Sequence, residues 1–209
     1  MNRSAVRRWA VALAGGVSLF ATGGCLQPSL NPLFTPEDGR TDVRVEGTWA
    51  CDDTGTRTWT FEKKDDTEDG KAFSFYRIAI KDGDTSGDVV AILGHLGDRD
   101  FMTFATEEGP NGLPSFVKRQ YLGINTFGRI TIDRDRLQIS MMPAEWGDKH
   151  KNDVLYGLGA LQGEHGFVFT APSTALQAMV LAHGGDKGAF EDAVTLVRPG
   201  KTGGKCYSE

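Results

Sequence analysis

The chain has 209 residues, of which 39% are hydrophobic and 24% charged, and this composition indicates one globular domain and excludes a disordered chain. Its net charge is −5 at pH 7, so no basic surface for nucleic acid is expected. Glycine accounts for 27 residues, against a usual share of ~7%, and this excess favours many tight turns and a β-rich chain over a helical bundle.

The first 24 residues have the features of an export signal. Three arginines form a positive start, and residues 9–24 are almost entirely apolar or small. This run is shorter than the ~20 residues of a membrane-spanning helix and has the length of a signal-peptide core. The small residues directly before Cys25 resemble a bacterial lipobox, with Thr22 at the position where most lipoboxes have Leu. The resemblance implies cleavage before Cys25 and acylation of that cysteine. Two alternatives are a cleaved secretory signal with an incidental Cys25 and an uncleaved membrane helix.

Acylation of Cys25 predicts a protein of the cell envelope that is anchored by lipid and faces the periplasm. Leu26 follows the cysteine, and the absence of Asp there favours the outer membrane over the inner one. Removal of residues 1–24 takes away three of the 23 basic residues and none of the 28 acidic ones, which leaves 185 residues with a net charge of −8. Such an acidic body is not attracted to anionic lipid, so the membrane contact is expected to be the acyl chains alone.

The other two cysteines, Cys51 and Cys206, are predicted to form a disulfide, because exported proteins fold in an oxidising compartment. The bridge would join the C-terminal tail to the first strand. Two unrelated buried thiols are the alternative.

Residues 25–42 contain three prolines and no apolar period, and they are predicted to be the acylated cysteine followed by a flexible tether. Residues 43–209 are predicted to form a single β-rich domain. The charged run 63–71 is expected to be a solvated loop, 107–115 a long Gly/Pro loop, and 143–152 one or two helical turns. Alternation of apolar and polar residues predicts strands at 43–51, around 59–61, and at 72–80, 88–96, 100–106, 119–132, 136–142, 166–170 and 193–198.

One helix is predicted, over residues 174–183. Thr174 and Gln177 fit a capping box, and Gly184 and Gly185 provide a stop. An apolar stripe at helical spacing runs from Leu176 through Met179 and Val180 to His183.

The predicted fold is therefore mainly β. We expect an antiparallel barrel of eight or nine strands, or a strongly curled sheet, with one C-terminal α-helix packed against it. The barrel is preferred because aromatic residues alternate along the strands, and an eight-stranded barrel leaves room for side chains or one small ligand.

No motif assigns an enzymatic activity. The four histidines, His95, His150, His165 and His183, lack the spacing of metal ligands, and no G-x-S-x-G, H-E-x-x-H or C-x-x-C motif occurs. No catalytic residue, metal or cofactor is assigned.

The first strand carries Gly47-Thr48-Trp49, which resembles the G-x-W motif of lipocalins and other calycins, small barrels that hold apolar ligands. The resemblance implies a basic partner for the tryptophan, and Arg198 is the candidate, with its guanidinium expected to stack on Trp49. A core tryptophan at a barrel end, with no ligand, is the alternative.

A second resemblance covers most of the chain after residue 24. It is similar to a family of uncharacterised bacterial lipoproteins, which open with a Pro-Ser-x-x-Pro-Leu-[FY] tether and end with a capped helix and a final strand. This implies export, acylation and a β-rich domain, and no particular activity. The matching segments are CLQ (25–27), PSLNPLFTPED (28–38), EGTWA (46–50), TWTFEK (58–63), NTFGRI and DRLQIS (125–140), TAPSTALQ (170–177) and AVTLVRP (193–199).

The sequence is compatible with two functional hypotheses. The first is a membrane-tethered barrel that binds an apolar small molecule or a lipid in its interior, lined by Trp49, Trp59, Phe61, Phe73 and Phe75. The second is an envelope structural or interaction protein without a ligand cavity, which docks a protein partner through loop 63–71 or loop 107–115.

Overall fold

The computed structural model describes residues 26–68, 70–106, 123–150, 158–163 and 166–207. The predicted signal, Cys25, the loop 107–115 and the first part of the strand predicted at 119–132 lie outside the described residues.

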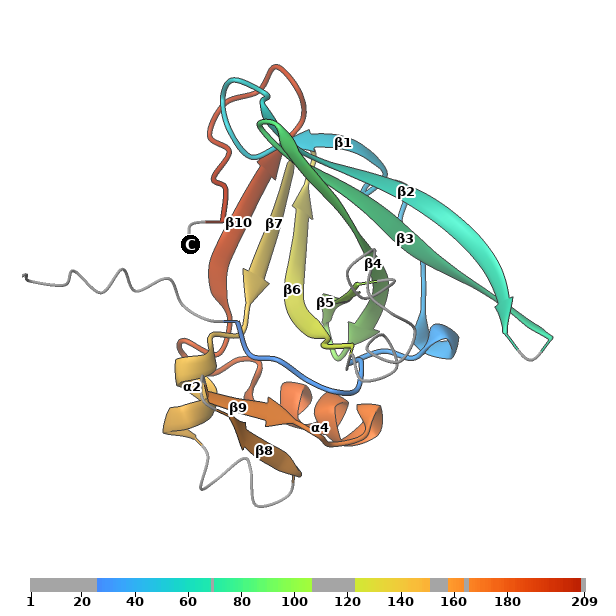
Figure 1. Cartoon of the computed structure of the whole chain (residues 1–209), viewed down its shortest axis with the longest axis vertical. Coiled ribbons are helices and arrows are strands. Elements are labelled where there is room, and N and C mark those ends of the chain that lie inside the picture. Colours follow the sequence, from blue (N-terminus) through green and yellow to red (C-terminus); the bar gives the residue numbers. More distant parts are fainter. Residues whose placement is uncertain (1–25, 69, 107–122, 151–157, 164–165, 208–209) are drawn as a thin grey trace, which may run out of the picture.

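Eight antiparallel strands close into a barrel in the order β1-β10-β7-β6-β5-β4-β3-β2 (Figure 1). Strands β1 to β6 each pair with the next along the chain, and β10 returns to pair with β7 on one side and with β1 on the other, which closes the barrel. This confirms the predicted antiparallel barrel. The strands are β1 (Gly47–Ala50), β2 (Arg57–Glu68), β3 (Lys71–Asp82), β4 (Thr85–Leu96), β5 (Arg99–Ala105), β6 (Thr126–Asp133), β7 (Arg136–Met141) and β10 (Glu191–Val197).

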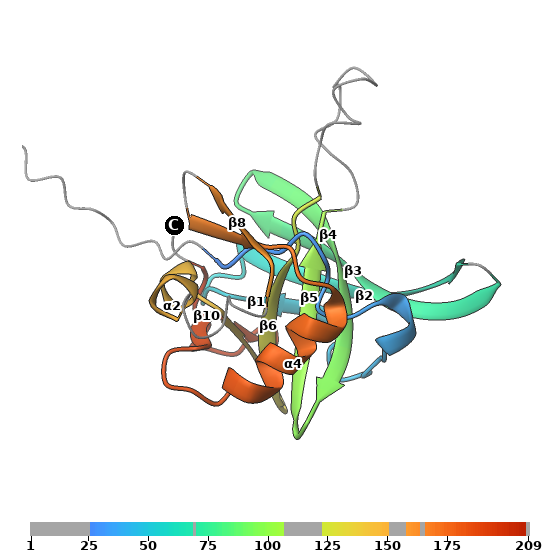
Figure 2. The ribbon, with the colours of Figure 1, turned by 90° about the horizontal axis from the view of Figure 1, so that it is seen from below.

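The chain leaves the barrel between β7 and β10 and forms a second layer beneath it (Figures 1 and 2). This layer contains the short helix α2 (Ala144–Lys149), the hairpin of β8 (Ala160–Gly163) and β9 (Gly166–Phe169), and the helix α4 (Ser173–His183). The sequence predicts α4, α2 and β9, but not β8. Strand β9 contains Phe167, Val168 and Phe169, whereas β8 has Leu161 as its one large apolar residue.

The predicted capping box of α4 is wrong. The N-cap position is Pro172, with no side-chain cap. Gln177 instead donates from Nε2 to the carbonyl oxygen of Leu33 at 3.0 Å and to Asp38 Oδ2 at 3.2 Å. A long-range contact therefore replaces the local one, and it ties the helix to the N-terminal segment.

Two hydrophobic cores lie on opposite sides of the barrel wall. The inner core fills the barrel with side chains of one parity, among them Trp49, Phe61 and Ile78. The outer core lies between the wall and the second layer, where Phe101 of β5 and Phe127 of β6 both lie within 6.4 Å of the Phe190 ring, centroid to centroid. Strand β5 is therefore apolar on both faces, unlike a strand with one face in solvent.

Residues 26–42 do not form a flexible tether. Leu33 is fully buried and Phe34 is 1% exposed, and both belong to the outer core. Backbone N–H groups of the segment donate to carbonyl oxygens of the domain: Gln27 to Met142 at 2.9 Å, Ser29 to Asn125 at 2.8 Å, Leu30 to Phe169 at 2.8 Å and Arg40 to Leu93 at 2.8 Å. The prolines keep the segment extended, so its remaining donors face neighbouring strands rather than one another.

The charged run 63–71 is also not a loop. It forms most of a β-arm, residues 62–75, in which β2 and β3 extend beyond the barrel as a two-stranded ribbon (Figure 1). The prediction that these charges lie outside the core is correct, but a ribbon that projects into solvent exposes charged side chains as well as a loop does. Cross-strand and same-strand pairs accommodate them, such as Ser74 Oγ to Asp65 Oδ1 at 2.5 Å and Lys64 Nζ to Glu62 Oε1 at 2.6 Å.

Most other strand boundaries agree with the sequence to within a few residues. The exceptions are the strand predicted at 119–132, because β6 begins only at Thr126, and the first strand. Residues 43–46 form a turn, in which Val43 is 77% exposed, and β1 begins only at Gly47. The closure between β1 and β10 is consequently short, with Ala50 opposite Val197 as its one register pair. We call this closure the β1–β10 seam.

The packing of the N-terminal segment predicts that Gly94→Ala is destabilising. A Cβ atom at Gly94 would lie 2.5 Å from the ring of Phe34, so the ring or the strand must shift, at a cost of about 1–3 kcal/mol. Gly87, on the same strand, is the matched control, because a Cβ atom there meets nothing within 4 Å. Urea unfolding should show a lower free energy of unfolding for Gly94→Ala and an unchanged one for Gly87→Ala. Equal effects of the two substitutions would contradict the packing of residues 26–42 against the barrel.

Candidate functional site: the barrel lumen

Trp49 lies at the start of the barrel interior and is fully buried. Its Nε1 donates to the carbonyl oxygen of Val45 at 2.7 Å. The guanidinium carbon of Arg198 lies 3.7 Å from the centroid of the indole, which confirms the predicted stacking. The same guanidinium donates to the carbonyl oxygens of Glu46 at 2.9 Å and Arg44 at 2.8 Å, so it fixes the turn before β1 as well as the tryptophan.

Gly47 owes its identity to this arrangement. Its φ is +98°, a left-handed conformation, and a Cβ atom there would lie 3.1 Å from a guanidinium nitrogen of Arg198. Glycine therefore satisfies both the backbone conformation and the close approach of the arginine.

Tyr76 fills the interior next to Phe61, with ring centroids 6.4 Å apart. Its hydroxyl accepts from the backbone N–H of Asp42 at 2.7 Å and donates to the Asp42 carbonyl oxygen at 3.0 Å. Burial raises the pKa of Tyr76 above its usual value, so the phenol stays neutral. This part of the barrel is a packed core.

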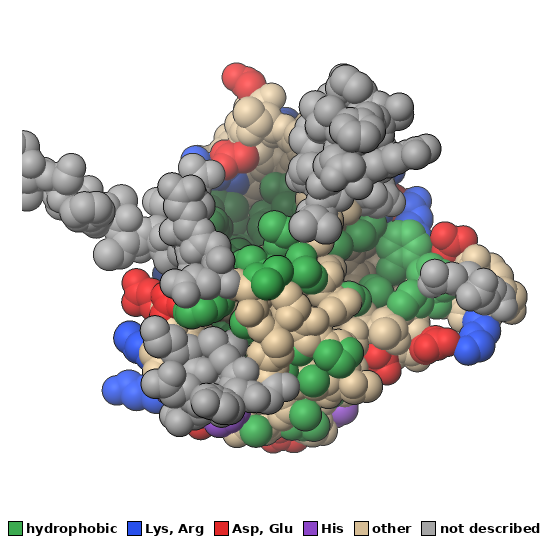
Figure 3. Space-filling model, turned by 60° about the horizontal axis from the view of Figure 1, so that its bottom comes forward, with side chains coloured by type: hydrophobic (Ala, Val, Ile, Leu, Met, Phe, Trp, Pro, Cys, Tyr) green, Lys and Arg blue, Asp and Glu red, His purple; other side chains and the backbone are tan. Residues whose placement is uncertain are grey.

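The rest of the lumen holds a cavity of about 220 Å³. Seven of the eight strands contribute to its wall, and all of its lining side chains are aliphatic or aromatic except Thr126. Hydrophobic side chains are visible at the bottom of a hollow in the space-filling view (Figure 3). The lining residues are Leu26, Trp59, Ile80, Val89, Phe104, Thr126, Ile139, Met141, Val194 and Tyr207.

The five aromatic residues expected to line an interior are placed in three different environments. Trp59 lines the cavity. Trp49 and Phe61 belong to the packed inner core and are buried. Phe73 and Phe75 lie on the β-arm, half-buried, with ring centroids 5.9 Å apart. Their parity along β3 is opposite to that of the inward-facing Tyr76 and Ile78, so they do not reach the lumen.

Aromatic residues alone do not identify most of the lining, which is largely aliphatic. Ile80, Val89 and Ile139 share the inward parity of their strands, so the period of two would have identified them. Leu26 carried no such signal, since it lies in the segment predicted to be a tether.

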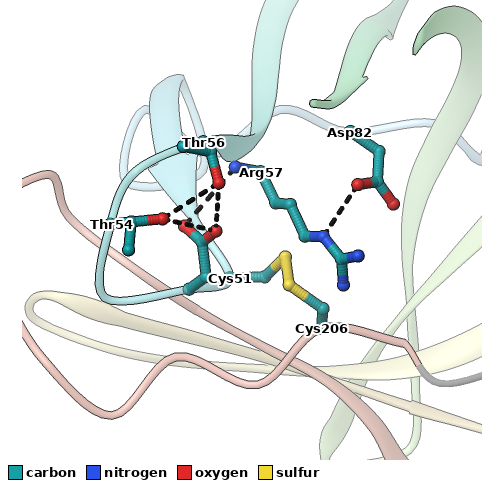
Figure 4. Close-up of a disulfide and its surroundings, with 7 residues drawn as sticks. Cys51, Thr54, Thr56, Arg57, Asp82 and Cys206 are labelled. Carbon is teal, nitrogen blue, oxygen red and sulfur yellow. Dashed lines mark hydrogen bonds and ion pairs between the residues drawn. A yellow bond between two sulfur atoms is a disulfide. The ribbon is translucent and has the colours of Figure 1, made fainter. Parts of the chain in front are cut away.

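A second cavity of about 360 Å³ adjoins the lumen, with which it shares Trp59, Ile80 and Tyr207. The disulfide Cys51–Cys206 lies in its wall and confirms the predicted pairing (Figure 4). Arg57 and Asp82 line the same wall and form an ion pair, Nε to Oδ1, at 2.7 Å. The disulfide thus holds the chain next to Tyr207 at this end of the lumen.

The turn beside the disulfide contains the carboxylate with the largest resolved pKa shift. Asp52 accepts from the hydroxyl of Thr56 at 2.6 Å and from that of Thr54 at 2.9 Å. These hydrogen bonds, with that of Thr56 the strongest, lower the pKa of Asp52 to about 2.

Because of these hydrogen bonds, we expect the contribution of Asp52 to stability to depend on pH in a defined direction. The folded-state pKa of Asp52 lies below the unfolded value, so its contribution to stability is present above about pH 4 and is lost as the pH falls toward 2. Thr56→Val should raise the pKa of Asp52 toward its usual value, and Thr54→Val should raise it less. An NMR titration of the side-chain carboxyl carbon measures both; equal shifts, or none, would contradict the assigned cause.

A third cavity, of about 450 Å³, lies over α2, between Trp146, His150 and Lys187. The Trp146 and His150 rings stack with centroids 4.3 Å apart. His95 and His183 each pair with one carboxylate, Asp100 and Asp186. Among the described residues, no group of three or more His, Cys, Asp or Glu side chains is placed to hold a metal ion.

Within the described part of the chain, no helix has the length and apolar character needed to cross a membrane. Comparison of the chain with protein-family models, with curated proteins and with solved structures finds no match.

Proposed function

We propose that the protein is an exported, lipid-anchored barrel that binds one apolar small molecule or lipid chain in its lumen. The observation that carries the proposal is the apolar cavity of about 220 Å³ inside the barrel. It is larger than the ~150 Å³ apolar cavity that takes up benzene and smaller than the ~300 Å³ at which sites for drug-sized ligands begin. A small ring compound or part of an acyl chain has the matching size.

The surroundings of the lumen support this proposal. Trp49 and Arg198 have the relationship expected from the lipocalin-like first strand, a feature of barrels that hold apolar ligands. None of the lining residues is acidic or basic (Asp, Glu, Lys, Arg or His), so a charged ligand would find no oppositely charged partner among them.

The envelope location rests on the sequence before Leu26. The export signal and the lipobox-like residues before Cys25 support cleavage at that cysteine and its acylation. The disulfide is the type of bond that persists in exported proteins. The anchor is then the lipid on Cys25, with the outer membrane as the proposed site.

A titration tests the lumen as the binding site. Residues 25–209 with Cys25→Ala, which removes the acylation site, should bind the apolar dye N-phenyl-1-naphthylamine saturably, with increased dye fluorescence. Val89→Trp should weaken binding more than about tenfold, because Val89 lines the cavity and the indole would fill it. Val90→Trp is the matched control, since Val90 is the next residue of β4 and faces the other side of the wall.

Circular dichroism and thermal unfolding should show that all three proteins are folded. Absence of saturable binding in the parent protein would reject the proposal. The alternative function, docking of a protein partner, would then be favoured, and the β-arm is the surface that supports it because it projects from the barrel.

A further inference from the structure

Leu26, the first described residue, lines the lumen cavity. Cys25, the proposed acylation site, is its direct neighbour in sequence. We propose that the lumen is occupied by an acyl chain carried on Cys25 of the same polypeptide. This inference rests on the proposed function, because it requires both acylation of Cys25 and a lumen that accepts an apolar chain.

The position of Leu26 is fixed by its neighbours. Leu26 forms an antiparallel bridge with Pro143, and the Gln27 N–H donates to the Met142 carbonyl oxygen at 2.9 Å. The Gln27 side chain is buried, and its Nε2 donates to the carbonyl oxygen of Phe167 at 2.8 Å. The chain is therefore held at the rim formed by the end of β7, and the side chain of Leu26 faces into the barrel.

The distance from this rim to Cys25 is set by covalent geometry. One residue spans at most ~3.6 Å, so an acyl chain on Cys25 would be attached within one residue of Leu26, which lines the cavity. With no flexible tether between anchor and lumen, an attached acyl chain has the effective concentration of a short-linker ligand, in the millimolar range. A free ligand would have to compete against that concentration.

The shape and chemistry of the lumen suit a chain. From Leu26 the cavity passes Val89 and Phe104 and reaches Trp59 and Tyr207, where it meets the second cavity of about 360 Å³. The wall along this route is apolar, so methylene groups would leave water without separating a polar group from its partner. One chain occupies the route, and the remaining chains of a multiply acylated cysteine stay in the membrane, where two are enough for stable anchoring.

Photocrosslinking tests this occupancy directly. The acylated protein is produced with p-benzoylphenylalanine in place of Trp59, an aromatic residue that lines both cavities. Irradiation should join residue 59 to the acylated Cys25 peptide, in a yield independent of protein concentration. The matched control carries the same photoreactive residue at Thr60, whose side chain is on the outer face of β2, next to Thr48. Equal crosslinking at both positions would overturn the inference.

A second arm separates failure of this inference from failure of the proposed function. The Cys25→Ala protein with the photoreactive residue at position 59 is irradiated with added palmitic acid. A crosslink to palmitic acid, without one to the acylated Cys25 peptide, would show a lumen that accepts chains but does not hold its own. No crosslink in either arm would overturn both. Mass spectrometry that finds Cys25 without acyl chains would overturn the inference and the proposed anchor, and would leave binding in the lumen to be decided by the palmitic acid arm.

Discussion

Replacement of Cys51 and Cys206 by alanine is expected to lower the free energy of unfolding by about 5 kcal/mol. The bond links residues 155 positions apart in sequence, so in the unfolded state it restricts the conformations of almost the whole chain of the domain. It also lies at the β1–β10 seam, where one register pair closes the barrel. Beyond Val197 the tail returns to this seam, and Lys205 and Thr195 exchange two backbone hydrogen bonds of 2.8 Å.

Urea unfolding in a Cys25→Ala background measures this loss, because the two bridged cysteines are then the only ones present. The same protein with its disulfide reduced is the control, and it should lose as much stability as the double alanine variant. A loss below about 1 kcal/mol would mean that the hydrogen bonds of the tail close the seam without the disulfide. Binding of the dye should also weaken in the double variant, because Cys206 positions Tyr207 in the wall of the lumen.

The second large effect is expected at the stacked pair of Trp49 and Arg198. Trp49→Ala should cost about 3–5 kcal/mol, the usual range for removal of a buried aromatic side chain. Arg198→Ala should cost about 2 kcal/mol, because the guanidinium donates two hydrogen bonds to backbone oxygens before β1. Trp49 lies within β1 and Arg198 directly follows β10, so the pair supports the β1–β10 seam, which the disulfide also supports.

A double-mutant cycle with Trp49→Phe and Arg198→Ala separates the stacking from the hydrogen bonds. We expect a coupling of about 1 kcal/mol, since an indole face attracts a guanidinium more strongly than a phenyl ring does. Trp146→Phe with Arg198→Ala is the control pair, and it should be additive because Trp146 lies on α2 and belongs to the outer core, whereas Arg198 stacks on Trp49 of the inner core. Additivity in both cycles would contradict an energetic role for the stacking.

Local patterns were sufficient for the barrel but not for the segments that pack against it. Alternation identified most strands, since an inward parity recurs every second residue whatever the partner strand is. The N-terminal segment was misassigned because its partners, among them Asn125 and Phe169, are remote in sequence and no local period reveals them. The prediction of a loop at 63–71 is wrong because charged residues indicate exposure to water and not a backbone conformation. The β-arm is exposed and is nevertheless a pair of strands.

In the candidate site too, sequence patterns predict some features, and others depend on how distant side chains pack. Cys51 and Cys206 were paired from the expected compartment, and Arg198 was matched to Trp49 from the first-strand motif. The cavity itself depends on which side chains fill the barrel and which leave space, a matter of volumes that composition does not specify. Phe61 and Trp59 share a strand and a parity, yet one is buried in the core and the other borders the cavity.

The docked N-terminal segment has a consequence for the order of events during biogenesis. The hydrogen bonds that hold residues 27–30 reach partners 95 and 140 positions further along the chain, which are synthesised later. Until those residues have been made and have folded, residues 27–30 lack the partners that hold them in the domain. Under the proposed acylation of Cys25, the modifying enzymes would therefore have their best access before the domain closes, and later modification would require residues 26–30 to detach from the folded barrel.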